Sequence, residues 1–362
     1  MTSSTPEHPS HKFSIGIDLG TTHSVLSYIE PPLNELDEPT QNILAIPQLT
    51  AAGEIENKLQ LPSFIYQAHS AELSKGATVL PWTAEPEHLV GEIARNRGRK
   101  TPLRLVSSAK SWLCHTSIDC KAPILPTETQ DEVERISPFD ASVAYLQHLT
   151  NAWNHQFPAH QLNQQDLTIT VPASFDPAAR ELTIEAAHTI GLKQAVLLEE
   201  PQAAFYSWIE KSQGGWRDQV SVGDIILVVD IGGGTTDLSL IAVTDNDGNL
   251  ELTRIAVGDH ILLGGDNMDL ALAYTIKAKL EKEGDRLAPW QVQALSHSCR
   301  EAKENLFSNP DVNEVPIVVS NRGSSLIGGA LRTVLTREEL NHVLIEGFLP
   351  QVVVSETPMA RP

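Results

Sequence analysis

One sequence pattern occurs twice in this chain and constrains its fold more than any other feature. Residues 15–29 read IGIDLGTTHSVLSYI, and residues 227–243 read LVVDIGGGTTDLSLIAV. Each copy has an apolar run, an aspartate, an apolar residue, glycine, a Thr-Thr pair and a second apolar run that begins near a serine. Such self-similarity indicates duplication of a structural unit. We therefore expect two halves of similar plan.

Each copy is typical of a β-hairpin whose turn approaches an anion. Glycine permits backbone conformations closed to other residues and lets backbone N–H groups lie close to a phosphate. Asp18 and Asp230 stand at the ends of the first strands, where carboxylate oxygens suit Mg²⁺, directly or through its waters. Two ordinary hairpin turns are the alternative. Because the Gly-Thr-Thr pattern occurs twice, it favours two hairpins that hold the phosphates of a nucleotide between two lobes.

Length and composition agree with two globular lobes. The chain has 362 residues, 41% of them hydrophobic, which is too long for one compact core and too apolar for disorder. No run approaches the roughly 20 apolar residues of a membrane-spanning helix, and the start MTSSTPEHPSHK lacks the apolar core of a secretory signal. We expect a soluble cytoplasmic protein with no membrane partner.

The charge argues against nucleic acid as a partner. A formal net charge of −20 repels phosphate backbones. One basic cluster, at residues 95–104, is either a docking patch or, more commonly, a solvated helix face. The three cysteines, Cys114, Cys120 and Cys299, lack metal-ligand spacing and are expected to be reduced structural thiols.

Local signals in the middle of the chain indicate an α/β fold. Residues 167–171 (LTITV) form a β-rich run, and Asp176-Pro177 then supplies a helix N-cap with proline at the first helical position. Gly191 is a stop signal before a second strand at 195–198. A strand, a capped amphipathic helix and a strand form a β-α-β unit.

Turn and linker signals give the predicted boundaries. Residues 1–12 are predicted to be a flexible tail and residues 31–42 (PPLNELDEPTQN) a surface loop. The polar stretch 210–223 places a lobe boundary between residues 13–212, lobe I, and 213–362, lobe II. Asp266, after a Gly-Gly turn, is expected to cap the helix that follows.

Five segments follow one another in the order and approximate spacing of a known family. They read GIDLGTTHS (16–24), VPASFDPAARELTIEAAHTIGL (171–192), LLEEPQAAFYSW (197–208), VVDIGGGTTDLSL (228–240) and GDHILLGGDNMD (258–269). Together they resemble the ATP-binding domain of DnaK-type (seventy-kilodalton heat-shock) chaperones over residues 13–340. Actin and the sugar kinases share the general fold, but LLEEPQAAF and LLGGDNMD resemble the chaperones more closely.

The resemblance implies the two-lobed actin-like ATPase fold, a duplicated mixed β-sheet with flanking helices and the nucleotide in the cleft between the lobes. It implies ATP/ADP and Mg²⁺ as cofactors, with K⁺ as a further candidate. The implied activity is hydrolysis of ATP coupled to the binding or folding of client polypeptides. Clients and co-chaperones would be partners of the full-length protein.

The resemblance also implies roles for individual residues. Asp18 and Asp230 would orient water bound to Mg²⁺. Catalytic roles would fall on Lys110, Glu200, Thr235 and Asp237. Nucleotide contacts would come from Gly20, Thr21, Thr22, Gly232, Gly233, Gly234, Thr235, Gly264, Gly265 and Lys303. A surface lysine is the alternative for Lys110, and Glu199 is expected to be solvated or paired.

Three residues match the family's coupling positions between nucleotide and client sites: Pro172, Arg180 and Pro201. Proline there would fix the backbone at a lobe hinge, whereas simple helix capping and chain reversal would favour the same residues. Both explanations stay open.

Several positions depart from the family pattern. His23 stands where asparagine is usual, Arg300 where an acid is usual, and Phe307 where a serine would contact the base or ribose. Phe307 would either stack on the base or fill core space, the commoner fate of a helical phenylalanine. The chain also stops before the last strand of lobe II and before any peptide-binding domain, so a fragment of a longer protein is expected, with a naturally short member as the alternative.

Two other functions fit the same general fold. A small-molecule kinase would use a carboxylate to activate a substrate hydroxyl in place of water. A nucleotide-binding scaffold of the actin type would use ATP to control assembly, although a net charge of −20 disfavours self-association.

Overall fold

The chain forms two compact units in the computed structural model, which describes residues 12–31, 39–69, 71–115, 117–127, 129, 133–258, 261–319 and 330–357. The first unit comprises Met1–Gly98 and Leu103–Leu263, and the second comprises Arg99–Pro102 and Gly264–Pro362. This division falls after residue 263, whereas the predicted lobes meet at residues 212 and 213. The lobe assignment stays a prediction. The predicted tail at 1–12 lies outside the described residues except for Lys12.

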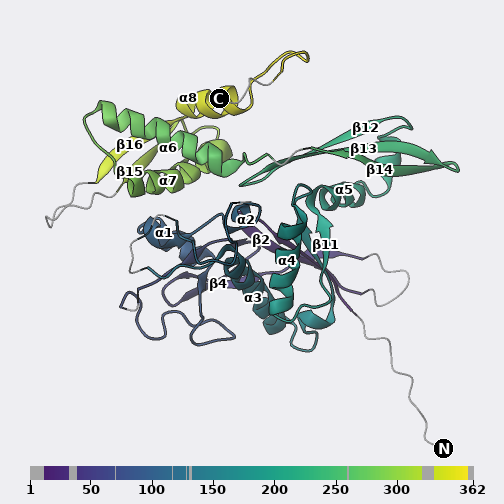
Figure 1. Ribbon diagram of the computed structural model, residues 1–362, viewed down its shortest axis with the longest axis horizontal. Coiled ribbons are helices and arrows are strands. Elements are labelled where there is room, and N and C mark those ends of the chain that lie inside the picture. The colour runs from purple at the N-terminus through teal and green to yellow at the C-terminus, as the bar shows by residue number, and fades with distance from the viewer. Residues whose placement is uncertain are drawn as a thin grey trace, which may run out of the picture. The chain divides into compact units, whose positions relative to one another are not determined.

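The first unit is built on a mixed sheet that contains the first copy of the repeat (Figure 1). Its strands, in spatial order, are β11 (Val196–Glu199), β10 (Asp166–Val171), β1 (Ser14–Leu19), β2 (His23–Ile29) and β3 (Gln41–Ile43), and β6 (Leu61–Pro62) also pairs with β2. Strand β1 pairs in parallel with β10 and antiparallel with β2. The antiparallel β1–β2 pair is the predicted first hairpin.

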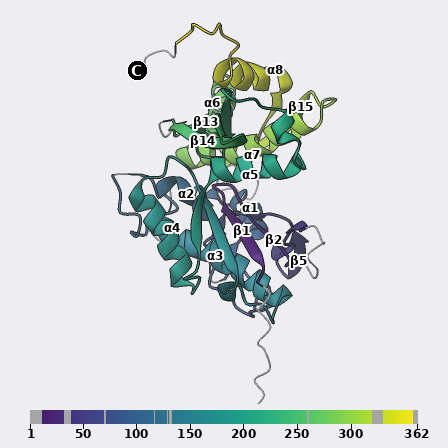
Figure 2. The same ribbon diagram turned by 90° about the vertical axis from the view of Figure 1, so that its right-hand side faces the viewer.

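Two long helices, α3 (Pro138–Gln156) and α4 (Pro177–Thr189), pack side by side in this unit (Figure 2). Their apolar residues and the inward residues of β1, such as Ile17 and Trp153, share one buried core. Asp176 accepts a hydrogen bond from the backbone N–H of Ala179 and begins α4, and Gly191 follows its end with φ of +88°. The predicted β-α-β unit with its cap and stop is confirmed.

Shorter elements complete the first unit. A β-hairpin is formed by β4 (Ile46–Ala51) and β5 (Glu54–Lys58), and a small sheet by β7 (Ile65–Tyr66), β8 (Leu89–Val90) and β9 (Leu105–Val106). Helices α1 (Glu92–Gly98) and α2 (Ala109–Trp112) lie in the same part of the sequence, and 3₁₀ turns occupy Pro102–Arg104, Leu162–Gln164 and Gly215–Asp218. The predicted loop at 31–42 lies partly outside the described residues, and its last two residues begin β3.

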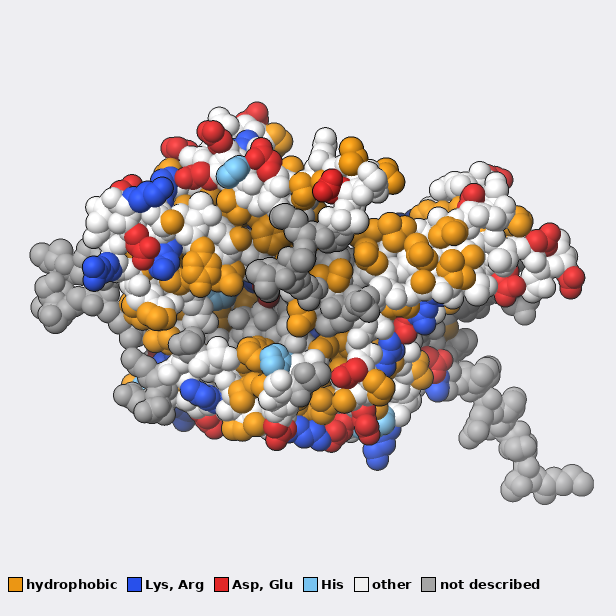
Figure 3. All heavy atoms as spheres, turned by 45° about the horizontal axis from the view of Figure 1, so that its top comes forward, with side chains coloured by type: hydrophobic (Ala, Val, Ile, Leu, Met, Phe, Trp, Pro, Cys, Tyr) orange, Lys and Arg blue, Asp and Glu red, His pale blue; other side chains and the backbone are white. Residues whose placement is uncertain are grey.

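The second copy of the repeat forms its own antiparallel sheet of β12 (Ile225–Ile231), β13 (Thr236–Asn246) and β14 (Asn249–Val257). Helix α5 (Glu200–Lys211) packs against β12 and β13. The second predicted hairpin is therefore confirmed. Its setting differs from the first, because β1 lies between two strands while β12 is at the edge among the described residues. Alternate residues of β12 from Ile225 to Ile231 are half-exposed, and hydrophobic side chains gather over these strands in Figure 3.

The second unit consists of two packed helices, a two-stranded sheet and a terminal helix. Its elements are α6 (Gly265–Lys282), α7 (Pro289–Ser308), β15 (Glu314–Val319), β16 (Leu331–Thr336), α8 (Arg337–Leu340) and a π-helical turn at Asn341–Glu346. Buried residues of these elements, including Leu272 and Leu295, form a separate core.

The predicted cap of α6 is wrong by two residues. Gly264 is the N-cap, and its backbone N–H donates to Oδ1 of Asn267 at 2.9 Å. Asp266 lies in the first turn and forms an ion pair with Arg300. Arg300 on the neighbouring helix therefore binds the carboxylate of Asp266. Local sequence alone predicts that this carboxylate accepts a bond from the helix backbone.

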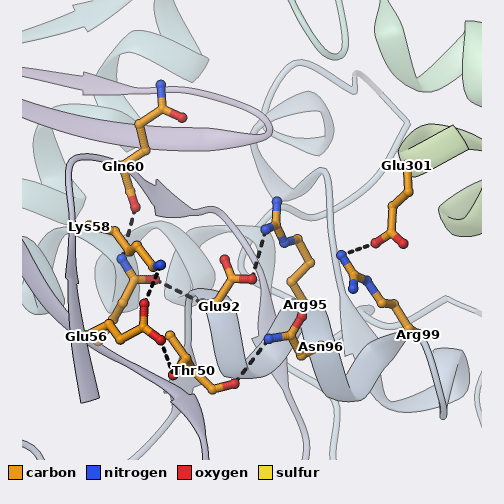
Figure 4. Close-up of polar contacts among 10 residues, drawn as sticks. Thr50, Glu56, Lys58, Gln60, Glu92, Arg95, Asn96, Arg99 and Glu301 are labelled. Atoms are coloured by element: carbon orange, nitrogen blue, oxygen red, sulfur yellow. Dashed lines mark hydrogen bonds and ion pairs between the residues drawn. The ribbon is translucent and has the colours of Figure 1, made fainter. Parts of the chain in front are cut away.

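The basic cluster at 95–104 is largely paired. Arg95 forms an ion pair with Glu92 at 2.8 Å on α1, next to the bond from Asn96 to the backbone oxygen of Thr50 (Figure 4). Arg97 contacts Glu72 at 2.6 Å. In the second unit, Arg99 pairs with Glu301. These contacts favour a structural role over a docking patch.

The described helices include none long and apolar enough to cross a membrane. The three cysteines are free thiols, and burial raises the pKa of Cys114 and of Cys299 to about 12.

We expect His148 to make the stability of the first unit depend on pH. It is buried on α3, its Nε2 lies 3.0 Å from the backbone oxygen of Pro47, and burial lowers its pKa from 6.5 to about 4. The unfolded chain binds the proton more tightly, so stability falls as the pH drops from 6.5 towards 4. Between pH 7 and pH 5 the loss is about 2 kcal/mol from this group.

Urea unfolding at several pH values, followed by tryptophan fluorescence, measures this contribution. His148→Gln should remove that part of the pH dependence. His155→Gln, on the exposed side of the same helix, serves as the control and should leave the slope unchanged. Equal slopes in the wild type and His148→Gln would contradict the assignment.

Candidate functional site

The turns of the two repeated hairpins lie against each other in the first unit. A Cβ added to Gly233 would lie 2.4 Å from Cγ2 of Thr22, and one added to Gly234 would lie 2.2 Å from Oγ of Ser111 and 3.3 Å from Cγ2 of Thr21. Only glycine permits this approach without displacing a neighbour. The sequence predicted that these turns face each other, and the structure brings them together.

Hydrogen bonds from nearby residues fix the conformation of each turn. The backbone N–H of Gly232 donates to the oxygen of Thr235 at 2.8 Å and closes the second turn. In the first turn, Oγ of Ser63 donates to the backbone oxygen of Gly20 at 2.8 Å. A Cβ at Gly20 would lie 2.3 Å from the oxygen of His23, so this turn also requires glycine. His23 directs Nδ1 toward Oγ1 of Thr22, at 3.3 Å.

A buried ion pair stands beside the two turns. Nζ of Lys110, on α2, lies 2.5 Å from Oε1 of Glu200, the first residue of α5. Burial opposes the charge on Lys110, but the carboxylates of Glu200, Asp18 and Asp230 outweigh it and raise the pKa of this lysine. The alternative of a surface lysine is therefore wrong, because Lys110 is buried.

Three aspartates lie near the Lys110–Glu200 ion pair. Asp18 accepts a hydrogen bond from Oγ1 of Thr170 at 2.9 Å, and Asp237 accepts one from Oγ1 of Thr235 at 3.1 Å. Burial raises the pKa of Asp230, and the charges of Asp237 and Asp18 raise it further. Burial likewise raises the pKa of Glu200 against the opposing charge of Lys110. In both groups burial is the largest cause, and neighbouring aspartates raise the pKa further.

The donor set fits Mg²⁺ held largely through its own water. All the candidate ligands are carboxylates, the donors that Mg²⁺ prefers, and Oδ1 of Asp237 is buried with no hydrogen-bond partner. Among the described residues, no three acidic, histidine or cysteine side chains are close enough together to bind a metal by themselves. A Mg²⁺ ion that keeps several waters and takes further ligands from phosphate would satisfy this arrangement.

Most of these groups line one cavity of about 920 Å³ within the first unit. Its lining includes Asp18, Thr21, Lys110, Glu200, Asp230 and Thr235. Ser111, Cys114 and Thr170 also line it. No motif in the sequence marks these three residues, since each reaches the cavity only because strands or helices distant in sequence meet there.

The remaining predicted nucleotide contacts lie in the second unit. Nζ of Lys303 lies 3.5 Å from the backbone oxygen of Gly265 and forms an ion pair with Asp269 at 2.7 Å. Asp269 is only 1% exposed and also pairs with Arg300, at 2.7 Å. The two basic side chains of α7 are thus bound to acids of α6.

Of the two alternatives for Phe307, core packing is wrong, because this residue is 48% exposed, and stacking on the base stays a prediction. Residues 259 and 260 of the segment expected on the adenosine side lie outside the described residues.

Of the predicted coupling residues, Pro172 lines the cavity. Arg180 donates to the backbone oxygens of Phe175 and Ala173 and to Glu199 at 2.9 Å. Pro201 is buried in the first turn of α5. Glu199 was expected to be either solvated or paired, and in the structure it is paired.

The mixed sheet, the duplicated hairpins and the carboxylate-lined cavity define an actin-like ATPase fold. Residues 14–354 match the family model described as Hsp70 protein. The chain belongs to the Hsp70 family.

Curated relatives agree with this family. The chain is similar to chaperone protein HscA homologs: 29% identical over 267 residues to that of Actinobacillus pleuropneumoniae serotype 5b, and 28% identical over 345 residues to that of Bordetella pertussis. These alignments cover 73% and 93% of this chain but 37% and 47% of the relatives. The chain thus spans less than half the length of these relatives.

Gly233→Ala should destabilise the protein through its contact with Thr22. The new methyl group would meet Cγ2 of Thr22 at 2.4 Å, and overpacking of this kind costs about 1–3 kcal/mol. Thr22→Ser removes the opposing methyl and keeps the hydroxyl, so the double variant should recover most of the loss in thermal unfolding.

Gly215→Ala is the matched control, since no atom lies within 4 Å of its added Cβ. If Thr22→Ser failed to relieve Gly233→Ala, the two turns would not be in the contact described.

Proposed function

We propose that this chain is the nucleotide-binding domain of a chaperone similar to DnaK and hydrolyses ATP to ADP and phosphate in the presence of Mg²⁺. The observation that carries this proposal is the meeting of two Gly-Thr turns beside the Lys110–Glu200 pair in one acid-lined cavity. Phosphoryl transfer requires positioned charge more than covalent chemistry. The cavity lining supplies Lys110 and the carboxylates of Asp18, Glu200 and Asp230, and the two turns beside it are rich in backbone N–H groups.

The roles follow from charge and position. Backbone N–H groups of Gly20 and of Gly232, Gly233 and Gly234, with the hydroxyls of Thr21 and Thr22, would bind phosphate oxygens. Lys110 would neutralise charge near the γ-phosphate, because its neighbours hold it protonated. Thr235 would bond the same phosphate group.

The carboxylates divide between the metal and the attacking water. Asp18 and Asp230 would hold the water shell of Mg²⁺, which when bound would neutralise phosphate charge. Glu200 would orient the nucleophilic water. Asp237 would orient the same water or bind a K⁺ ion. Gly264, Gly265 and Lys303 would contact the adenosine, for which Lys303 must exchange its bond to Asp269.

The coupling of hydrolysis to client binding is the wider part of the proposal. Pro172, Arg180 and Pro201 would transmit the nucleotide state, and movement of the predicted lobes 13–212 and 213–362 would carry it. Unfolded polypeptides and co-chaperones would bind the full-length protein, in the cytoplasm. The HscA homologs that the chain resembles are named as chaperone proteins, which supports this coupling.

Removing Lys110 or Asp237 should abolish most hydrolysis. Lys110→Met and Asp237→Asn each remove a charge next to the reacting phosphate, and such losses lower kcat by about 10²–10³-fold. Phosphate release with Mg²⁺ and K⁺ present measures the rate, and Lys193→Met, which changes an exposed lysine, is the control. Hydrolysis that survives both variants would refute the assignment.

The reaction products distinguish hydrolysis from transfer. Free phosphate is expected in the absence of any acceptor, whereas a phosphorylated sugar would indicate a kinase. ATP-dependent growth of light scattering would indicate a filament.

The full-length protein should bind unfolded polypeptide with an affinity that changes between ATP and ADP. Fluorescence anisotropy of a labelled unfolded peptide measures this change. The same affinity with both nucleotides would overturn the chaperone part of the proposal and leave the ATPase part standing.

A further inference from the structure

One acidic side chain next to the site is held between two arginines from separate elements. Oε1 of Glu199 lies 2.9 Å from Nη2 of Arg180, on α4, and its other oxygen forms an ion pair with Nη1 of Arg254, on β14. The Glu199 side chain is 14% exposed, and those of Arg180 and Arg254 are 29% and 33% exposed. All three belong to the first unit.

Glu199 occupies the junction from which the candidate catalytic carboxylate projects. It is the last residue of β11 and the N-cap of α5, and Glu200 is the first residue of that helix. A side chain at an N-cap ordinarily accepts a bond from the helix backbone, but that of Glu199 makes no such bond. Its carboxylate is committed to the arginines, so their positions influence the backbone that carries Glu200.

Arg254 reaches this junction from the sheet of the second hairpin. Leu240 pairs with Ala256 and Ile241 pairs with Arg254, which leaves Ile255 as the extra residue of a β-bulge. A bulge redirects the side chains beside it and is frequent near functional sites. Strand β14 pairs with β13, which carries Asp237, and β13 pairs with β12, which carries Asp230.

We propose that Arg254 is a positioning residue, which through Glu199 couples the sheet of the second hairpin to the orientation of Glu200 in the cavity. This inference rests on the proposed ATPase function. The sheet carries Asp230 and Asp237, while β11 and α5 carry Glu200, so the bridge joins the two sources of carboxylates. A shift of the sheet then moves Glu200 with it.

The physical reason is the cost of leaving charge unpaired. Without Arg254, the largely buried Glu199 still pairs with Arg180, but its second carboxylate oxygen has no charged partner. This unpaired charge favours rearrangement of the junction. A displacement of about 1 Å in a catalytic group can cost up to 10²-fold in rate. Binding of phosphate depends on the turns and should change little.

The test is a double-mutant cycle in the full chain. Arg254→Gln and Glu199→Gln should each lower kcat for ATP hydrolysis by about 10-fold and change KM less than 2-fold. The double variant should match the single variants, because either change breaks the same bridge. Arg254→Lys, which keeps the charge, should recover part of kcat.

Glu185→Gln is the matched control. Glu185 lies on α4, as Arg180 does, and the variant removes its ion pair with Lys121, in which both side chains are about half-exposed. Its kcat should equal that of the wild type. A change of less than 2-fold in Arg254→Gln, or strictly additive losses in the double variant, would overturn the inference.

A second readout separates this inference from the proposed function. Hydrogen exchange at the backbone amides of residues 199–204 should accelerate in Arg254→Gln and in Glu199→Gln, but not in Glu185→Gln. If the wild type failed to hydrolyse ATP, the proposed function would fail, and unchanged exchange in the variants would still overturn the coupling.

Discussion

Close approach of two polypeptide turns is the constraint on which the site depends. Gly233 and Gly234 lie so near Thr22 and Ser111 that no side chain fits between them. This contact brings Asp230 to the cavity that Asp18 also lines, and Lys110 is the basic residue among the candidate catalytic groups there. Burial raises the pKa of Asp230 and of Glu200, and the neighbouring aspartates add to it. A cation and a polyphosphate are complementary ligands for such a place.

Local sequence predicted those parts of the fold that local interactions determine. The two hairpins and the cap of α4 by Asp176 depend on residues adjacent in the chain, and all are confirmed. Asp266 shows where this reasoning fails. Its pattern fitted an N-cap, but an arginine 34 residues later on α7 provides a stronger partner. A charged group on another element can thus outweigh a local preference.

Much of the candidate site could be recognised because its residues fall in repeated motifs, although their roles stay predictions. Other parts could not, for reasons of distance. Thr170 bonds Asp18 across 152 positions, and Arg254 meets Glu199 from a strand that contains a β-bulge. Of the two alternatives for Phe307, core packing was the commoner for a helical phenylalanine, yet its position on α7 leaves it exposed. Sequence spacing alone therefore predicts neither the register of distant strands nor which face of a helix is exposed.

The arginine–glutamate–arginine bridge restricts how this chain can diverge over evolution. Replacing Glu199 alone leaves two cations adjacent, and replacing Arg254 alone leaves an acid with one partner. Arg180 also donates to the backbone oxygens of Phe175 and Ala173, so it keeps partners when Glu199 changes. Positions 199 and 254 are therefore expected to change together, because loss of either charge removes the other's partner.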